Sequence, residues 1–281
     1  MPVIPSEVEN RAGGDAATWT GRPKAERAGN ERIKSLDGSA IARDVSTSPD
    51  MTERLFTALN VYNDITPRSA AMNMAIDEAL LEFTIIPTIR FYRWRSPALS
   101  FGYFGKFSDV AIYAAERDLV RRWTGGGIVF HGEDLTYSIV IPRNSPVFEK
   151  SSISIYETIH LGLAHALNGL GQCAQVVGSG RYTAGTSQRG VPTNTCFENP
   201  VRADVMIDGR KIAGAAQRRT RRGLLQQGSI QGIPMTSELV QKFAQVLSAD
   251  CSEFEINEQI FERARELAQQ KYGTDSWLRK R

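Results

Sequence analysis

Residues 204–213, Asp-Val-Met-Ile-Asp-Gly-Arg-Lys-Ile-Ala, carry the clearest fold signal in the chain. Asp208-Gly209 suits a two-residue type I′ turn, because both residue types tolerate the positive φ angles that this turn requires. Apolar residues flank the pair on either side. The segment therefore predicts two antiparallel strands joined by a tight hairpin.

Outward from this hairpin, the spacing of apolar residues predicts further strands and helices. The strand candidates are 89–94, 98–101, 128–131 and 135–141, and we expect Gly132-Glu133-Asp134 to form a hairpin-like turn between the last two. The segments with helical spacing are 69–83, 155–170, 239–247 and 260–268. Strands interspersed with helices, several of them joined by hairpins, predict an α+β domain with a mixed, mainly antiparallel sheet flanked by helices.

The composition is that of a soluble, globular protein. Of 281 residues, 41% are hydrophobic and 23% are charged, and no apolar run approaches the roughly 18–20 residues of a membrane span. The excess of 34 Lys and Arg over 31 Asp and Glu is too small to indicate nucleic acid by itself. Cys173, Cys196 and Cys251 include no C-x-x-C pair, so we expect no disulfide framework, no metal site and a cytoplasmic location.

Residues 1–50 differ from the rest of the chain. They contain hardly any apolar clusters and mix acidic with basic residues, a composition that buries too little surface to offset the entropy of ordering. Two interpretations remain open: a disordered N-terminal extension, or a start codon assigned upstream of a native start at Met51. In both cases the patterned domain spans residues 51–281.

A second unusual stretch is 121–131, Arg-Arg-Trp-Thr-Gly-Gly-Gly-Ile-Val-Phe-His. Three consecutive glycines remove every side chain from one patch of backbone, so an extended ligand can lie against it while amide N–H groups face its polar end. A flexible turn would also explain a bare triple glycine, but the two arginines and the histidine beside it favour a site. The run matches neither the dinucleotide-binding nor the P-loop pattern.

Three motifs resemble those of the lipoate/octanoate A/B protein ligase family. Residues 121–131 are similar to its RR-x-[ST]-G-G-G-x-V-x-H signature, and residues 211–218, Lys-Ile-Ala-Gly-Ala-Ala-Gln-Arg, to its K-[IV]-[SA]-G-[SA]-A-Q segment. Residues 73–80, Asn-Met-Ala-Ile-Asp-Glu-Ala-Leu, resemble its N-M-A-x-D-E-A-L helix. The resemblance implies a fold related to biotin protein ligases and class II aminoacyl-tRNA synthetases, and makes 51–281 an acyltransferase domain that moves an eight-carbon acyl group to a lysine.

The resemblance also implies which residues form the site. The residues expected to bind the substrate are Arg121, Arg122, Thr124, Gly125, Gly126, Gly127, His131 and Gly214. Lys211 resembles the family's essential lysine, whose ammonium would hydrogen-bond the acyl carbonyl and stabilise developing negative charge. Outside these motifs, Lys211 would be read as a solvated hairpin lysine and His131 as a structural histidine.

Cys196 helps to choose between branches of the family. Thr195-Cys196-Phe197-Glu198 resembles a Cys-Phe segment of the cysteine-type octanoyltransferases and amidotransferases, whereas ATP-dependent ligases more often carry Asn-Asp where this chain has Ala203-Asp204. A thiolate is the nucleophile in such chemistry. A lone cysteine is usually structural, but polar neighbours and the motifs favour Cys196 as the nucleophile.

A basic run surrounds Lys211. Residues 210–222 contain Arg210, Lys211, Arg218, Arg219, Arg221 and Arg222 and no acidic residue. The run is either a solvated face or a docking surface for acidic acyl carrier proteins and lipoyl domains. No interleaved aromatic residues or nucleic-acid motif support binding of nucleic acid.

These features predict an octanoyltransferase of lipoate biosynthesis. Octanoate would pass from octanoyl-acyl carrier protein, through a thioester on Cys196, to a lysine of a lipoyl domain or of the glycine cleavage H protein, without a cofactor, a metal, nucleic acid or a membrane. Three alternatives remain: an octanoyl-[H protein]:lipoyl-domain amidotransferase, a lipoate-protein ligase that depends on ATP and Mg²⁺, and a catalytically silent relative that binds acyl-proteins.

Overall fold

The computed structural model describes residues 54–178, 201–234 and 236–280. All of them belong to the compact unit Asp50–Arg281. The predictions for residues 1–50 and for Cys196 therefore lie outside the described residues.

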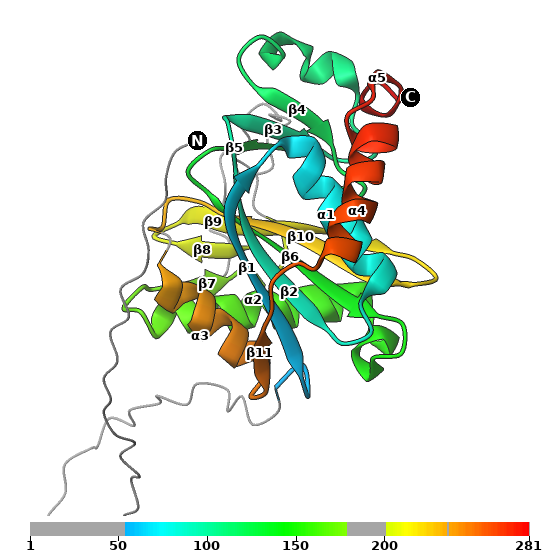
Figure 1. Cartoon of the computed structure of the whole chain (residues 1–281). Helices are drawn as coiled ribbons and strands as arrows, with labels where there is room; N and C mark the ends of the chain where they lie inside the picture. The colour runs from blue at the N-terminus through cyan, green and yellow to red at the C-terminus, as the bar shows by residue number, and fades with distance from the viewer. Residues whose placement is uncertain (1–53, 179–200, 235, 281) are drawn as a thin grey trace, which may run out of the picture. The chain divides into compact units, whose positions relative to one another are not determined.

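The described strands form one large and one small sheet (Figure 1). The strands of the large sheet are β1 (Leu59–Arg68), β2 (Thr88–Trp94), β6 (Leu135–Pro142), β7 (Gln175–Val176), β8 (Val205–Ile207), β9 (Arg210–Arg219), β10 (Gly223–Ile230) and β11 (Cys251–Glu253). Their spatial order is β11-β1-β2-β6-β10-β9-β8-β7. The strands of the small sheet are β3 (Ala98–Phe101), β4 (Asp118–Arg121) and β5 (Ile128–His131), in the order β4-β3-β5.

Antiparallel pairing dominates both sheets. Strand β1 pairs in parallel with β11 and β2, and β3 with β4. The other neighbours, from β2 through β6, β10, β9 and β8 to β7, and β3 with β5, are antiparallel. The prediction of a mixed, mainly antiparallel sheet is confirmed.

Helices cover both faces of the large sheet (Figure 1). Helices α1 (Ala70–Phe83) and α4 (Glu258–Leu267) pack on one face, and α2 (Ser152–Asn168) and α3 (Ser237–Leu247) on the other. Because side chains alternate along a strand, Ile139 joins the α2–α3 core and its neighbour Val140 joins the α1–α4 core. All four helices lie where apolar spacing predicted them. None of the described helices is long and apolar enough to cross a membrane.

Short elements complete the chain. The 3₁₀ turns are η1 (Phe107–Asp109), η2 (Ala111–Tyr113) and η3 (Pro146–Glu149). A π-helical turn at Ala268–Tyr272 follows α4 directly, and the short helix α5 (Asp275–Leu278) lies near the C-terminal end. Helix α5 contacts β4 of the small sheet.

The two predicted turns have different outcomes. Asp208 and Gly209 have φ angles of 49° and 75°, as a type I′ turn requires, and β8 pairs with β9. The predicted hairpin at residues 132–134 is wrong, because β5 pairs with β3 in the small sheet whereas β6 pairs with β2 and β10 in the large one. In residues 132–134, the Asp134 side chain is buried, and its carboxylate accepts from the Gly132 amide at 3.1 Å.

Candidate functional site

An apolar pocket lies where β3 and β5 of the small sheet approach β9 and β10 of the large sheet. Its lining residues are Met74, Tyr92, Trp94, Ser100, Arg122, Gly126, Val129, His131, Thr136, Lys211, Gly214, Ala215, Ala216, Gln227, Gly228 and Ser229. About 480 Å³ in and above it is free of atoms, a volume that includes space open to solvent. The fold thus brings together five predicted site residues, namely Arg122, Gly126, His131, Lys211 and Gly214.

Lys211 is held at the pocket wall by a buried carboxylate. Its Nζ lies 2.8 Å from Asp204 Oδ2, and the two side chains are 5% and 0% exposed. The same carboxylate accepts from the Tyr156 hydroxyl at 2.9 Å, and that hydroxyl accepts from the Ala215 amide at 2.9 Å. These contacts hold the ammonium in one place, because Tyr156 lies in α2, Lys211 lies in β9 and the Val201 amide also donates to Asp204 Oδ2 at 2.7 Å.

Gly214 leaves the space that the Lys211 side chain occupies. A Cβ at this position would lie 2.6 Å from Lys211 Cε and 2.8 Å from its Nζ. No heavy atom tolerates such a contact, so a side chain at residue 214 would displace the ammonium. The glycine in this motif is therefore explained by the lysine three residues before it.

His160 supports the Lys211–Asp204 pair from α2. Its Nδ1 lies 2.5 Å from the Ala203 carbonyl oxygen, and its Nε2 lies 2.9 Å from the Tyr137 hydroxyl. Ala203 has a φ of 70°, which an alanine rarely adopts. Burial lowers the pKa of His160 to about 4, so the ring stays neutral near pH 7. A neutral Nδ1–H donor thus holds the backbone just before Asp204.

The triple glycine packs closely on the strand-end residue Gly102. A Cβ on Gly102 would lie 2.0 Å from the Gly126 carbonyl oxygen and 2.7 Å from Gly125 atoms. Gly126 has a φ of 85°, a conformation that favours glycine. Gly126 lines both the pocket and a neighbouring cavity, which Gly127 also lines. Close backbone packing therefore requires a glycine at residue 102, and the positive φ favours one at residue 126.

Arg122 clamps this loop from inside the pocket. Its Nη2 donates to the carbonyl oxygens of Gly125 at 3.0 Å and Gly127 at 2.8 Å, and its Nη1 donates to Ser100 Oγ at 2.7 Å. The guanidinium is almost fully buried. Its planar fork is well suited to hold two carbonyls and a hydroxyl at once.

A chain of hydrogen bonds leads from Ser100 through His131 to Asp134. Ser100 Oγ lies 2.7 Å from His131 Nε2, and His131 Nδ1 lies 2.7 Å from Asp134 Oδ2. The His131 ring stacks on Trp94, with 4.0 Å between the ring centroids. Burial lowers the pKa of His131, so the imidazole is neutral near pH 7.

Asp134 is ionised and fully engaged. Burial raises its pKa, but the His131 ring and several donors outweigh burial, so the pKa lies below its ordinary value. Its Oδ2 accepts from the hydroxyls of Thr136 at 2.9 Å and Ser229 at 2.7 Å, in addition to the imidazole. Because Asp134 can only accept, His131 carries its proton on Nδ1.

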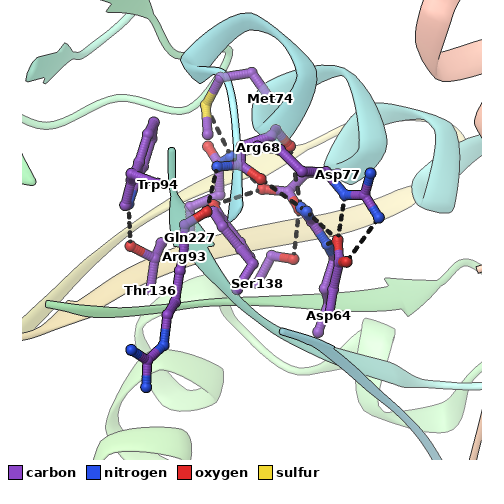
Figure 2. A network of polar contacts seen from close by, with 12 residues as sticks. Asp64, Arg68, Met74, Asp77, Arg93, Trp94, Thr136, Ser138 and Gln227 are labelled. Atoms are coloured by element: carbon purple, nitrogen blue, oxygen red, sulfur yellow. Dashed lines mark hydrogen bonds and ion pairs between the residues drawn. The ribbon is translucent and has the colours of Figure 1, made fainter. Parts of the chain in front are cut away.

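Thr124 connects the glycine loop to a buried polar network beneath the pocket. Figure 2 shows part of this network, including Gln227 and Asp77. The Thr124 hydroxyl donates to Gln227 Oε1 at 2.8 Å, and Gln227 Nε2 donates to Asp77 Oδ2 at 2.7 Å. Asp77 also accepts from Arg90 Nη1 at 2.9 Å, and both side chains are fully buried. The Thr124 hydroxyl is thus used for positioning, and Thr124 does not line the pocket.

The helix motif at residues 73–80 supplies structural contacts. Asn73 Oδ1 accepts from Arg90 Nη2 at 2.8 Å, and Arg90 also donates to Asp64 at 2.8 Å. Glu78 pairs with Lys271 of the C-terminal π-helical turn. The polar residues of this motif therefore hold α1 against β1, β2 and the C-terminal segment.

Arg121, predicted in the acyl pocket, is engaged elsewhere. The side chain is 1% exposed and does not line the pocket. Its guanidinium donates to the backbone carbonyls of Tyr103, Gly105, Trp277, Leu278 and Lys280. Side chains alternate along β4 and its continuation, so Arg121 and Arg122 face opposite sides. Arg121 ties α5 to the small sheet.

The basic run 210–222 does not form one continuous face. Lys211 is buried against Asp204, as described above. Arg218 stacks over two aromatic rings, Arg219 donates to two backbone carbonyls, and Arg222 pairs with Glu82 at 3.4 Å. Strand β9 and the turn after it distribute these cations over different surfaces.

The remaining cysteines have ordinary surroundings. Cys173 is exposed, and Cys251 is partly buried and donates to the Ser248 carbonyl. Burial raises the pKa of Cys251, which disfavours its thiolate. Among the described residues, no group of three or more His, Cys, Asp or Glu side chains could hold a metal ion.

Four polar residues of the site were not predicted from the sequence, namely Asp204, Ser100, Gln227 and Asp134. In the sequence, Asp204 stands where ATP-dependent ligases more often carry Asn-Asp, Ser100 lies in a strand candidate, and Gln227 belongs to none of the three motifs. Asp134 could have been found from its position three residues after His131. Ser100 and Gln227 reach the pocket only through strand pairing, so no local signal identifies them.

Solved lipoate protein ligases share this fold. A putative lipoate protein ligase from Thermoplasma acidophilum, solved with bound lipoic acid, has a TM-score of 0.61 and 23% identity and covers 79% of this chain and 98% of its own. A lipoate-protein ligase A solved with ATP has a TM-score of 0.60 over the same shares, also with 23% identity. Fold and pocket together therefore define an α+β protein of the lipoate protein ligase fold.

The chain belongs to the lipoyl protein ligase A/B catalytic domain family, whose model matches residues 69–263. A protein of Oceanobacillus iheyensis named octanoyltransferase LipM is 39% identical over 71% of this chain and 72% of its own length. One of the same name from Brevibacillus brevis is 36% identical over 58% of this chain and 62% of its own length. The alignments thus span about two thirds of these relatives, and the family resemblance of the three motifs is confirmed.

Proposed function

We propose that this chain is an octanoyltransferase of lipoate biosynthesis. The observation that carries the proposal is the Lys211 ammonium, fixed by buried Asp204 at the wall of an apolar pocket. A fixed cation in a mostly apolar pocket is well suited to stabilise the oxyanion of an acyl-transfer step. Relatives that are 36–39% identical carry the name octanoyltransferase, which supports this reaction class.

The acyl chain would lie in the apolar part of the pocket. Met74, Val129, Ala215 and Ala216 present apolar side chains there, and Gly126 leaves room beside them. The carbonyl end would face Lys211, because this ammonium lies at the edge of the apolar lining. The distance between this apolar lining and Lys211 would set the length of acyl chain that fits.

Transfer would take place in two steps. The Cys196 thiolate attacks the octanoyl thioester of acyl carrier protein and the new C–S bond forms. The C–S bond to the carrier breaks, and the leaving thiolate takes a proton from water. A lysine amine of a lipoyl domain or glycine cleavage H protein then attacks this second thioester, forms the amide and releases Cys196. In both steps Lys211 would hydrogen-bond the carbonyl oxygen as it becomes negative. We propose that neither step needs a cofactor.

A donor-competition assay tests the function. Purified protein receives octanoyl-acyl carrier protein or octanoylated H protein as donor and a lipoyl domain as acceptor, each with and without ATP and Mg²⁺. We expect transfer from the carrier protein without ATP, and an octanoyl adduct on Cys196 in intact-mass spectra. Cys196→Ser is expected to abolish the adduct, and Cys173→Ser, which changes an exposed thiol, serves as the matched control.

Other outcomes identify the alternatives. Transfer only from octanoylated H protein would indicate an amidotransferase, and strict dependence on ATP with pyrophosphate release would indicate a lipoate ligase. Absence of any acyl adduct in a single turnover would indicate a catalytically silent relative. Unchanged transfer by Cys196→Ser would contradict the thioester mechanism.

A further inference from the structure

The hydrogen-bonded chain Ser100–His131–Asp134 has no role in the steps above, although it reaches the pocket. Ser100 and His131 both line the pocket that Lys211 lines. The three residues lie in the order and at the distances of a serine–histidine–aspartate proton relay, with both links at 2.7 Å. Such a relay moves a proton from the hydroxyl end towards the imidazole.

The hydrogen-bond directions along this chain are determined. Asp134 accepts from Nδ1–H, so the neutral His131 ring accepts at Nε2. The Ser100 hydroxyl therefore donates its only proton to Nε2, while one of its lone pairs accepts from Arg122 Nη1 at 2.7 Å. A hydroxyl oxygen has two lone pairs. One acceptor position thus remains at Ser100 Oγ for a donor in the pocket.

His131 lies between the pocket and a surface recess. It lines both, and Asp134, Arg117 and Glu133 line the recess with it. The charged groups that face His131 are Asp134, Arg122 and Arg117. Asp134 stabilises the imidazolium, whereas the two arginines favour loss of its proton, so the ring can take up a proton and release it again.

We propose that Ser100, His131 and Asp134 form the general-base relay that deprotonates the attacking amine in the second acyl-transfer step. This inference rests on the proposed function, which supplies an amine acceptor and a thioester. Lys211 is paired with Asp204 and positioned for the carbonyl oxygen, so we assign the role of base to the relay.

In this step one C–N bond forms, one C–S bond breaks and one proton passes along the relay. The neutral amine nitrogen attacks the thioester carbonyl and the C–N bond forms. The nitrogen then gives one proton to Ser100 Oγ while the original Ser100 hydroxyl proton moves to His131 Nε2. The C–S bond breaks, and the departing thiolate takes up the proton that the imidazolium releases. The products are an amide and a thiol, with no change of oxidation state.

The test separates proton removal from acyl loading. Wild-type protein and Ser100→Ala are first loaded with octanoate from octanoyl-acyl carrier protein, and intact mass follows loading. The loaded proteins are then mixed with a lipoyl domain or with hydroxylamine, and decay of the adduct is timed. The nitrogen of the hydroxylamine adduct is much more acidic than an alkylammonium, so water can take its proton without a relay.

We expect loaded Ser100→Ala to lose about 10²–10⁴-fold in its rate of transfer to the lipoyl lysine, measured per octanoyl adduct. Release by hydroxylamine is expected at the wild-type rate. His131→Gln retains an N–H donor for Asp134 but cannot take up a proton, and it should show the same selective loss. Ser248→Ala, a fully buried serine whose hydroxyl bonds Asp250 away from the pocket, is the matched control with unchanged rates.

Equal losses with lysine and hydroxylamine, or loss of loading in both variants, would overturn the relay and leave a structural role for Ser100. Wild-type transfer to lysine by Ser100→Ala would overturn it as well. A wild-type protein that never loads octanoate would overturn the proposed function, and the relay with it. Failure of the relay alone is therefore distinguishable from failure of the function.

Discussion

At the scale of single residues, the position of the Lys211 ammonium depends on the absence of a side chain at residue 214. Gly214 contributes no side chain, and the ammonium occupies the space that a Cβ would fill. Asp204 and Tyr156 supply the opposite side of this niche. The glycine three residues after Lys211 is thus a steric requirement of one buried ion pair.

Gly214→Ala is expected to lower octanoyl transfer by about 10²-fold, because a displacement of the catalytic group by about 1 Å has such an effect. Steady-state transfer to a lipoyl domain measures it, and the melting temperature should stay near the wild-type value since only a side-chain end must move. Gly169→Ala, whose added Cβ would have no neighbour closer than 3.4 Å, is the control. Equal activity of the two variants would contradict the steric explanation.

At the scale of elements, α2 contributes the histidine that fixes the start of β8. His160 is fully buried, and its pKa lies near 4 because burial disfavours the imidazolium. In the unfolded chain the same group takes up a proton near pH 6.5. Between these values the unfolded state binds more protons than the folded state, so stability falls as the pH falls.

We therefore expect the free energy of unfolding to decrease by about 3 kcal/mol between pH 7 and pH 4 through His160. Urea unfolding at a series of pH values measures it. His160→Gln, which retains a donor for the Ala203 carbonyl, should remove this part of the pH dependence. His165→Gln, on an exposed face of the same helix, is the control. A pH profile unchanged by His160→Gln would refute the assignment.

The C-terminal helix α5 is held by one buried arginine of β4. Arg121 donates to five backbone carbonyls, three of them in residues 277–280. Arg121→Lys keeps the charge but loses the planar fork, so we expect the free energy of unfolding to fall by about 3 kcal/mol. Limited proteolysis should then remove the last residues of the chain.

Arg279, which is exposed and pairs with Asp275, is the matched control. Arg279→Lys is expected to leave both the free energy of unfolding and the protease resistance of the C-terminal end unchanged. If the two variants behaved alike, Arg121 would not be the residue that holds α5. Octanoyl transfer measured alongside shows how far this contact contributes to the site.

At the scale of the whole molecule, the domain core starts close to Met51. Leu55 and Phe56 are buried in the α2–α3 core, and Phe56 forms a backbone bridge with Ser248. A chain that begins at Met51 keeps all of these contacts. We expect it to show the wild-type melting temperature and the wild-type rate of octanoyl transfer.

The control is a chain that begins at Thr57, which lacks Leu55 and Phe56. Loss of two buried apolar side chains should destabilise it by several kcal/mol, since each is worth about 1.5–3 kcal/mol. Thermal unfolding monitored by circular dichroism compares the three chains. A lower melting temperature for the chain that begins at Met51 would show that residues 1–50 contribute to stability.

Net charge is also a property of the whole molecule, and the total of +3 says little about any surface. Lys211 lies inside the protein, and Arg218, Arg219 and Arg222 are each engaged by a different neighbour. The cations of the run 210–222 are thus held by separate contacts.

Local patterns determined the elements and the family. Helical spacing located α1 to α4, Asp208-Gly209 specified the β8–β9 hairpin, and three short motifs identified the family. These features depend on neighbours within a few residues, through turn geometry and the side-chain periods of helices and strands. Lys211, Gly214, Arg122 and His131 could be named because they lie in two of the motifs that resemble the family's.

Only the tertiary structure decided how these pieces meet. Two strands separated by three residues belong to different sheets, because Asp134 turns inward to His131. Adjacent Arg121 and Arg122 serve the C-terminal helix and the pocket respectively. Ser100 approaches His131 across the β3–β5 pairing. Such contacts join residues that are distant in sequence, and packing of the sheets, which no local pattern encodes, brings them together.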